Sequence, residues 1–382
     1  MEIYADNAAT TKMSRIAAEA MINCMETVYG NPSSPHTFGQ KAWQALNGAR
    51  QKIAVLLGCR PGEITFTSGG TESDNQAIRT AAAIGARIGK KHILTTAFEH
   101  HAVLHTLRAL GKEGFEVTLL EVGEDGIIKP EHVSEAIRPD TCLVTVMYAN
   151  NEIGTIQPVS EIGEICCSRG ILFHTDAVQA AGHLPIWLKQ QHIDLLSLSS
   201  HKFHGPKGVG ILYCREGIPL ENVIYGGAQE KGKRPGTENL PGIVSMAAAL
   251  EESIGSLETN SAVVLKMRNR LIHGLSQIPG AVLNGDPERR LPGNVNFCFE
   301  GIEGESLLMM LDMHGIAASS GSACTAGSLD PSHVLLSIGR SRELAKSSLR
   351  LTIDEQNTDQ EIETIIAEVT NAVQSLKNMH IH

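Results

Sequence analysis

The sequence predicts an α/β protein whose large domain holds a mainly parallel seven-stranded sheet, followed by a smaller α+β domain. Two observations lead to this fold class. Between about residue 62 and residue 215, short apolar or β-branched runs alternate with longer amphipathic segments, and Gly or Pro separates them. After about residue 257 this regular alternation stops, which indicates a second unit of different architecture.

Seven runs in the first part have the length and composition of buried strands. Helical patterns lie between most of them, as at 72–87 and 101–113. Strands joined through helices form parallel sheets that are covered on both faces, and such sheets bind ligands at the carboxyl ends of their strands. The predicted strands are 63–69, 92–98, 116–122, 141–149, 171–177, 193–199 and 208–214.

The second part ends in the clearest helix of the chain. Thr358 and Glu361 form a capping-box pattern, and the apolar residues that follow recur at helical spacing. We expect a large domain over 15–257 and a small domain over 1–14 and 258–382. The small domain is expected to contain apolar or small-residue runs at 294–301, 316–324 and 347–354, and helices at 304–314 and near 331–338.

Composition and charge exclude several classes of function. The 382 residues include 42 acidic and 32 basic side chains, and the net charge of −10 disfavours direct nucleic-acid binding and an anionic membrane surface. The chain begins without a signal-like segment and has no apolar run of membrane-spanning length, so a cytoplasmic protein is expected. Its eight cysteines lack C-x-x-C spacing, so we expect buried thiols and neither a disulfide framework nor a structural zinc site.

Three features at predicted strand ends carry reactive groups. Lys202 lies in a Gly/Pro turn after a strand, where it can form a Schiff base if part of it is unprotonated; a solvated surface lysine is the alternative. Asp176 closes the preceding strand, where a carboxylate can keep a pyridine nitrogen protonated or can merely cap the next helix.

The third feature is the segment 67–75, in which a strand stops at two glycines before a helix. Gly70 and Thr71 can bind a phosphate through backbone N–H groups and a hydroxyl, or Thr71 can simply cap the helix. A phosphate turn, an aspartate and a lysine in this order are typical of the fold type I enzymes that use pyridoxal 5'-phosphate (PLP).

Longer motifs make this pattern specific, and the chain resembles the cysteine desulfurases of the NifS/IscS type over nearly its full length. These belong to the class V aminotransferases, with the PLP-dependent transferase fold type I. The matching strings are YADNAATT (4–11), GNPSSPH (30–36), SGGTESDN (68–75), EHHAV (99–103), ANNEIGTIQP (149–158), HTDAVQAAG (174–182), SHKFHGPKG (200–208), RPGTEN (234–239) and SSGSACTAGSLDPSHV (319–334).

The resemblance implies PLP as the cofactor and a homodimer as the assembly. Lys202 would be the lysine that holds PLP covalently, Asp176 would face the pyridine nitrogen, and Gln179 would donate to the ring hydroxyl. Thr237 would reach the phosphate from the neighbouring subunit. The other residues that the resemblance places around the cofactor are Gly70, Thr71, His100, Asn151, Ser199 and His201.

The resemblance also implies a substrate and a route for the proton. His100 would stack on the cofactor ring and move protons, although the residue by itself is equally typical of a helix cap. Asn31, Asn151 and Arg350 would bind the carboxylate of L-cysteine. Arg350 has an apolar neighbour on each side in a predicted strand, which favours a half-buried arginine that binds an anion, with an exposed strand arginine as the alternative.

Cys324 decides the reaction type. It lies in the loop of about 319–334, among Ser, Gly and Ala, which is unusual for a residue type that prefers burial; an incidental exposed thiol is the alternative. The resemblance implies that Cys324 takes the sulfur of L-cysteine as a persulfide, that L-alanine leaves, and that the sulfur passes to an iron–sulfur scaffold or another acceptor protein. No resident metal is expected, although Cys324 could transiently ligate an iron–sulfur cluster.

One departure and three rival functions remain open at this point. After Arg350 the chain continues with Leu351, Thr352, Ile353 and Asp354 where the family has Ser and then Gly, which leaves the end of that strand undefined. A selenocysteine lyase could use the same residues, a PLP aminotransferase would not need Cys324, and a catalytically weak scaffold protein would not need Lys202 and Asp176.

Overall fold

The computed structural model describes residues 2–321 and 330–379. Its centre is a seven-stranded sheet in the order β2-β8-β7-β6-β5-β3-β4, in which β8 runs antiparallel to β2 and β7 and the other pairs are parallel. This confirms the predicted sheet, because each strand lies inside a predicted run. The strands are β2 (Ile64–Thr67), β3 (His92–Thr96), β4 (Glu116–Leu120), β5 (Thr141–Thr145), β6 (Leu172–Asp176), β7 (Leu195–Ser199) and β8 (Gly210–Cys214).

Helices cover both faces of this sheet because neighbouring strand residues point to opposite sides. Ile93 of β3 packs in the cluster formed with α3 and α4, whereas Leu94 packs in the cluster on the other face. The same alternation holds for Leu195 and Leu196 of β7. The first face carries α3 (Gly70–Arg87) and α4 (His101–Lys112); the second carries α2 (Thr37–Leu56), α5 (Pro130–Ala136), α6 (Val159–Ser168) and α7 (Leu240–Gly255), with α1 (Arg15–Thr27) packed on α7.

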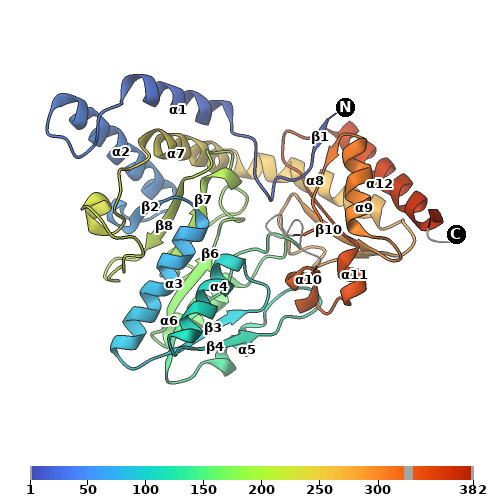
Figure 1. Cartoon of the computed structure of the whole chain (residues 1–382), viewed down its shortest axis with the longest axis horizontal. Coiled ribbons are helices and arrows are strands. Elements are labelled where there is room, and N and C mark those ends of the chain that lie inside the picture. The colour runs from blue at the N-terminus through green and yellow to red at the C-terminus, as the bar shows by residue number, and fades with distance from the viewer. Residues whose placement is uncertain (1, 322–329, 380–382) are drawn as a thin grey trace.

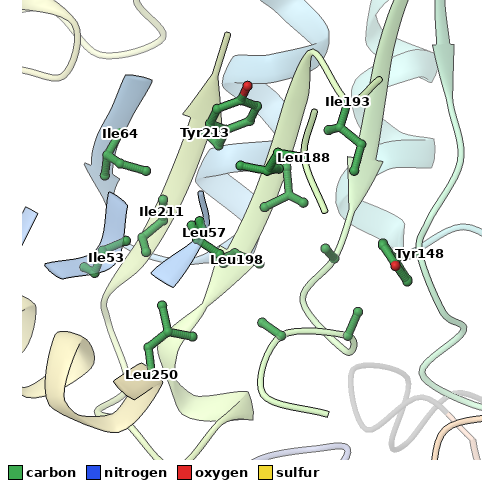
Figure 2. Packing of buried hydrophobic residues seen from close by; sticks show 14 of the residues in the cluster. Ile53, Leu57, Ile64, Tyr148, Leu188, Ile193, Leu198, Ile211, Tyr213 and Leu250 are labelled. Carbon is green, nitrogen blue, oxygen red and sulfur yellow. The ribbon is translucent and has the colours of Figure 1, made fainter. Parts of the chain in front are cut away.

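The second face holds the largest apolar cluster of the described residues. Figure 2 shows Ile53 of α2, Leu57 directly after it and Leu250 of α7 beside Leu198 and Ile211 of the sheet. These five side chains are nearly inaccessible to solvent. Burying a side chain of this size stabilises the fold by about 1.5–3 kcal/mol, so this cluster holds β7 and β8, and the turn between them, in a fixed position.

A second layered unit follows in the chain. Its sheet has the order β12-β10-β9 and is antiparallel, and a separate parallel pair joins β1 to β11 (Figure 1). The strands are β1 (Ile3–Tyr4), β9 (Ala281–Leu283), β10 (Asn294–Phe299), β11 (Ile316–Ala317) and β12 (Ser348–Thr352). The helices are α8 (Leu257–Leu275), α9 (Gly304–Met313), α10 (His333–Ser337), α11 (Arg342–Lys346) and α12 (Asp359–Met379).

The end of the chain follows the sequence pattern closely. Thr358 Oγ1 accepts from the backbone N–H of Glu361, and the Glu361 carboxylate accepts from that of Thr358, which confirms the capping box before α12. Strand β12, which contains Arg350, ends at Thr352. Thr352 Oγ1 accepts from the backbone N–H of Ala8 at 2.8 Å. The unusual residues after Arg350 therefore tie the N-terminal segment to this strand. The predicted domain boundary at 257 stays a prediction; α7 ends at Gly255 and α8 begins at Leu257.

Three short 3₁₀ helices complete the described elements, η1 (Pro61–Glu63), η2 (Ser200–Lys202) and η3 (Gln229–Gly232). Of these, η2 directly follows β7 and carries Lys202. Strands β2, β3, β5, β6 and β7 run in one direction, so their carboxyl ends meet at one edge of the sheet. Strand β12, which carries Arg350, belongs to the separate three-stranded sheet of the second unit.

Two further sequence expectations can be compared with the structure. Within residues 2–321 and 330–379, no helix combines the length and apolar character that a membrane crossing requires. The seven described cysteines form no disulfide; Cys24, Cys142, Cys166, Cys214 and Cys298 are buried, whereas Cys167 is exposed. Most described cysteines are thus the buried thiols that were expected.

Candidate active site

A cavity of about 220 Å³ lies at the carboxyl edge of the large sheet. It brings together residues from β6, β7, the start of α3, the turn before α4, the N-terminal segment and β12. Ten of the residues predicted from the sequence line it: Gly70, Thr71, His100, Asn151, Asp176, Gln179, Ser199, His201, Lys202 and Arg350.

Lys202 is held at the rim of this cavity by the N-terminal segment. Its Nζ donates to the carbonyl oxygens of Ala8 at 2.5 Å and of Ala9 at 2.8 Å. The backbone carbonyl oxygen of Lys202 lies 2.9 Å from His183 Nε2, and this contact helps to hold the turn in place. The lysine is thus half-buried and oriented by backbone groups, which differs from the solvated surface lysine considered above.

Asp176 ends β6 and is buried in the cavity wall. Its Oδ1 accepts from the backbone N–H of Val178 at 2.9 Å, so the carboxylate caps a turn and no helix begins there. Burial raises the pKa of Asp176, and His100, the hydrogen bond from the Val178 N–H and the Lys202 charge oppose that rise. A buried carboxyl group that accepts a hydrogen bond from the backbone N–H of Val178 can still interact with a cationic ligand.

The segment between β2 and α3 forms a narrow backbone turn. Gly69 has φ of 153°, a conformation that glycine adopts most readily, and it is the N-cap of α3 without a side-chain cap bond. A Cβ on Gly70 would lie 2.6 Å from Val178 Cγ2, so a larger residue there would have to displace the Val178 side chain. Thr71 lies inside the first turn of α3 and is not its cap, which removes the capping alternative and leaves its side chain on the cavity.

His100 combines a capping role with a place in the cavity. It is the N-cap of α4, and its Nδ1 accepts from the backbone N–H of Ala102 at 3.1 Å. Because Nδ1 is an acceptor, the neutral imidazole carries its proton on Nε2. His100 therefore caps α4 and also lines the cavity, and its role toward a cofactor stays a prediction.

Two other polar residues, His201 and Gln179, line the cavity. His201 Nδ1 lies 3.1 Å from Thr10 Oγ1, and burial together with Lys202 and Lys207 lowers its pKa to about 4. At neutral pH His201 is therefore an uncharged hydrogen-bonding group. Gln179 Nε2 donates to the same Ala8 carbonyl that accepts from Lys202, which links the two side chains.

Arg350 is almost fully buried, with 1% of its surface exposed, and the alternative of an exposed strand arginine is wrong. Its Nη1 donates to the Asn151 carbonyl at 3.0 Å and its Nη2 donates to Asp6 Oδ1 at 2.9 Å. Its Nε has no hydrogen-bond partner within the described residues. A buried N–H donor that lines a cavity and lacks a partner can bind an anion such as a carboxylate.

Two of the predicted residues that the structure describes do not line the cavity. Asn31 lies between α1 and α2, and Thr237 lies in the segment before α7. Ser33 and Glu238, which are close to Asn31 and Thr237 in the sequence, line a second hollow of the same chain. Asn31 and Thr237 therefore both lie near this second hollow. Cys324 lies outside the described residues.

Sequence reasoning missed three acids near the site. Asp6 pairs with Arg350, Asp74 lines the cavity from α3, and Glu99 is buried beside it, where burial raises its pKa to about 8. Asp74 follows Thr71 by one helical turn and thus shares its face, which is a signal that the sequence contained. Asp6 and Arg350 are 344 residues apart, and nothing local in the sequence links them.

Comparisons with known proteins agree with this arrangement. A family model described as aminotransferase class-V matches residues 3–365. The cysteine desulfurase IscS of Methanosarcina thermophila is 51% identical over 377 residues, which is 99% of this chain and 93% of the relative. A protein of the same description from Clostridium botulinum is 48% identical over 381 residues, which is 99% of this chain and 96% of the relative.

Solved structures have the same fold over almost the whole chain. A NifS-like protein superposes with a TM-score of 0.93 at 38% identity, covering 98% of this chain and 100% of its own. A protein described as SspA in complex with cysteine superposes with a TM-score of 0.82 at 36% identity, covering 92% of this chain and 98% of its own.

Proposed function

The chain belongs to the class-V aminotransferase family, and from this premise we propose that it is a cysteine desulfurase. It takes L-cysteine as substrate, releases L-alanine and retains the sulfur as a persulfide on Cys324. The observation that carries the proposal is the meeting of Lys202, Asp176, His100 and Arg350 in one cavity. These are the groups that a PLP-dependent reaction of an amino acid needs.

The residues present fit PLP. The turn at Gly69 and Gly70 and the start of α3 offer backbone N–H groups to a phosphate, with Ser199, His201 and Thr71 beside them. Lys202 would hold the aldehyde carbon, and Asp176 would face the ring nitrogen. When bound, PLP would withdraw electrons from the amino acid joined to it.

Lys202 and His100 handle protons in this proposal. Lys202 Nζ, once released from the Ala8 and Ala9 carbonyls, removes the proton from the Cα atom of the substrate. His100 presents the Nε2 proton because its Nδ1 is engaged by the α4 backbone. Asp176 would keep the ring nitrogen charged, and Arg350, whose Nε has no hydrogen-bond partner among the described residues, would bind the substrate carboxylate.

Cys324 supplies the nucleophile. Its thiolate attacks the substrate sulfur, an S–S bond forms, the Cβ–S bond breaks, and the electron pair left on Cβ takes up a proton to give alanine. The described residues on either side of 322–329 support this role. Ser319 pairs through its backbone with Arg350, and Ser332 forms a side-chain hydrogen bond with Glu152, next to Asn151.

We propose further that the chain acts as a homodimer. Large apolar side chains are exposed on α1, α2 and the segment before α7, among them Ile22, Phe38, Trp43 and Tyr225. Such an apolar surface is typical of an interface. Thr237 lies in the same region, where a partner subunit could use it, and Figure 1 shows α1 and α2 at the end of the molecule opposite α12.

The decisive test is the variant Cys324→Ala, with Cys167→Ala as the matched control because Cys167 is the described exposed cysteine. Cys324→Ala should bind PLP and L-cysteine yet release neither alanine nor sulfur, and Cys167→Ala should behave as the wild type. After one turnover, mass spectrometry should find about 32 Da added to the Cys324 peptide. Alanine release by Cys324→Ala at the wild-type rate would contradict the proposal.

Product analysis separates the rival functions. A keto acid in place of alanine would indicate an aminotransferase, and much faster turnover of selenocysteine than of cysteine would indicate a selenocysteine lyase. We propose an iron–sulfur scaffold or another sulfur-acceptor protein as the recipient of the sulfur. Loss of the labelled sulfur from Cys324 on addition of such a protein would test this step.

A further inference from the structure

We propose that Asp74 is a positioning residue that carries a proton and donates it as a hydrogen bond to Asp176, which keeps Asp176 ionised opposite the cofactor ring. This inference rests on the proposed PLP site and adds a residue to it. Asp74 belongs to the first turns of α3 and lines the cavity behind the phosphate turn.

Geometry places the two acids side by side. One ligating atom each from Asp74, Asp176 and His100 lies within 4.8 Å of the other two. Asp74 is 1% exposed and Asp176 is 6% exposed, so little water separates or screens them. Two carboxylates this close in a buried site cannot both be charged at low cost, and one proton must be held between them.

The neighbours of each acid decide where that proton lies. Asp176 receives the Val178 N–H and faces His100 and Lys202, all of which favour its charged form. Burial raises the pKa of Asp74 well above its usual value, Asp176 and Glu99 raise it further, and only a hydrogen bond with Ser197 opposes them. The proton therefore lies on Asp74.

His174, a second histidine close to Asp74, does not supply a positive charge at neutral pH. His174 Nε2 lies 3.6 Å from Asp74 Oδ1, but burial lowers the pKa of His174 to about 3, so the ring is neutral. Its nitrogens lie within hydrogen-bonding distance of the Thr145 and Ser197 hydroxyls. Asp74 Oδ1 is itself buried without a hydrogen-bond partner among the residues described, which leaves Asp176 as the natural acceptor for the acid proton.

Two substitutions of Asp74 distinguish a role as a hydrogen-bond donor from a role as a negative charge. Asp74→Asn keeps a hydrogen-bond donor of the same shape and cannot ionise, so the holoenzyme should lose PLP on dilution at a rate within about 2-fold of the wild type. Asp74→Ala removes the donor, and PLP should be lost about 10-fold faster or more, since a hydrogen bond to a charged group is worth at least that factor. Asp194→Asn, a buried acid away from the cavity, is the control.

Infrared difference spectroscopy of the holoenzymes gives a readout that does not depend on turnover. Wild type minus Asp74→Asn should show the C=O stretch of a protonated carboxyl group at neutral pH. Carboxylate bands in its place, or Asp74→Asn losing PLP as fast as Asp74→Ala, would overturn the inference, as would wild-type retention in both variants. If Asp74→Ala fails to fold, the spectrum still decides.

The same experiments distinguish failure of this inference from failure of the proposed function. A wild-type protein that carries no PLP on Lys202 would refute the proposed function itself. A wild-type protein that carries PLP there, with Asp74 ionised or without effect, refutes only the role of Asp74.

Discussion

Buried acids at the two edges of the large sheet differ in how fully the chain itself engages their carboxylate oxygens. At the amino edge, Asp194 accepts from the Phe173 N–H and from Arg215 Nε, so both of its oxygens are engaged within the chain. At the carboxyl edge of the same strands, Asp176 Oδ1 accepts from the backbone N–H of Val178 and the carboxyl group faces a cavity. The difference indicates that the first acid stabilises the fold and the second is available to a ligand.

Strand β3 repeats this contrast with histidines. His92 starts the strand, and its two ring nitrogens lie 2.7 Å from Thr141 Oγ1 and 2.9 Å from Thr118 Oγ1. His100 follows the end of the strand; its Nδ1 accepts from the backbone N–H of Ala102, and the residue lines the cavity. Residue type alone would not separate these two histidines; the edge of the sheet on which they lie does.

Lys202→Ala should give the largest effect at the carboxyl edge. Without Nζ, neither covalent attachment of PLP nor removal of the Cα proton is possible, so kcat should fall by about 10⁴-fold or more. Absorption spectra and an alanine assay measure the two losses. Lys207→Ala is the matched control, because Lys207 is exposed in the same turn and does not line the cavity. A PLP adduct on another lysine would break the assignment.

Asp176→Asn should give the next largest effect. The amide can keep the hydrogen bond from Val178 but cannot hold a proton on the ring nitrogen, so PLP should remain bound while kcat falls by about 100-fold. Such a loss corresponds to about 2.7 kcal/mol of transition-state stabilisation. Turnover near that of the wild type would mean that Asp176 serves only the turn, as Asp194 serves its own edge.

Arg350→Lys should have a moderate effect on substrate binding. Lysine keeps the charge but loses the planar fork that reaches Asn151 and Asp6 and leaves Nε for the substrate carboxylate. KM for L-cysteine should rise about 10-fold with a smaller change in kcat. Arg340→Lys is the control, because Arg340 binds Asn284 outside the cavity. An unchanged KM would remove Arg350 from the substrate site.

The sequence was sufficient for the sheet because each strand is an apolar run between glycines, and the packing simply follows their alternation. It also identified Lys202 and Asp176, since strand ends of a parallel sheet meet at one edge. It did not single out Asp74 or Asp6. The spacing of Asp74 from Thr71 indicates a shared helix face but does not show that an acid on that face takes part in the site, and Asp6 meets Arg350 only through the pairing of distant segments.

The sequence also leaves open which residues a partner subunit supplies. Thr237 and Asn31 match family motifs, yet both lie away from the cavity of their own chain. A motif predicts that a residue is used, but only the assembly determines which site it serves. Their roles remain predictions that depend on the proposed homodimer.

Asp194→Asn should have the smallest effect on catalysis, and it tests the comparison from the other edge. Asparagine keeps one acceptor oxygen for either Phe173 or Arg215 but loses the charge, and Arg215 is half-exposed, so water replaces part of the lost interaction. We expect the free energy of unfolding to fall by about 1–2 kcal/mol, measured as a lower Tm, while kcat/KM stays unchanged. A large loss of activity at unchanged Tm would show that the amino edge also takes part in the reaction, and the division between a stabilising edge and a ligand-binding edge would have to be abandoned.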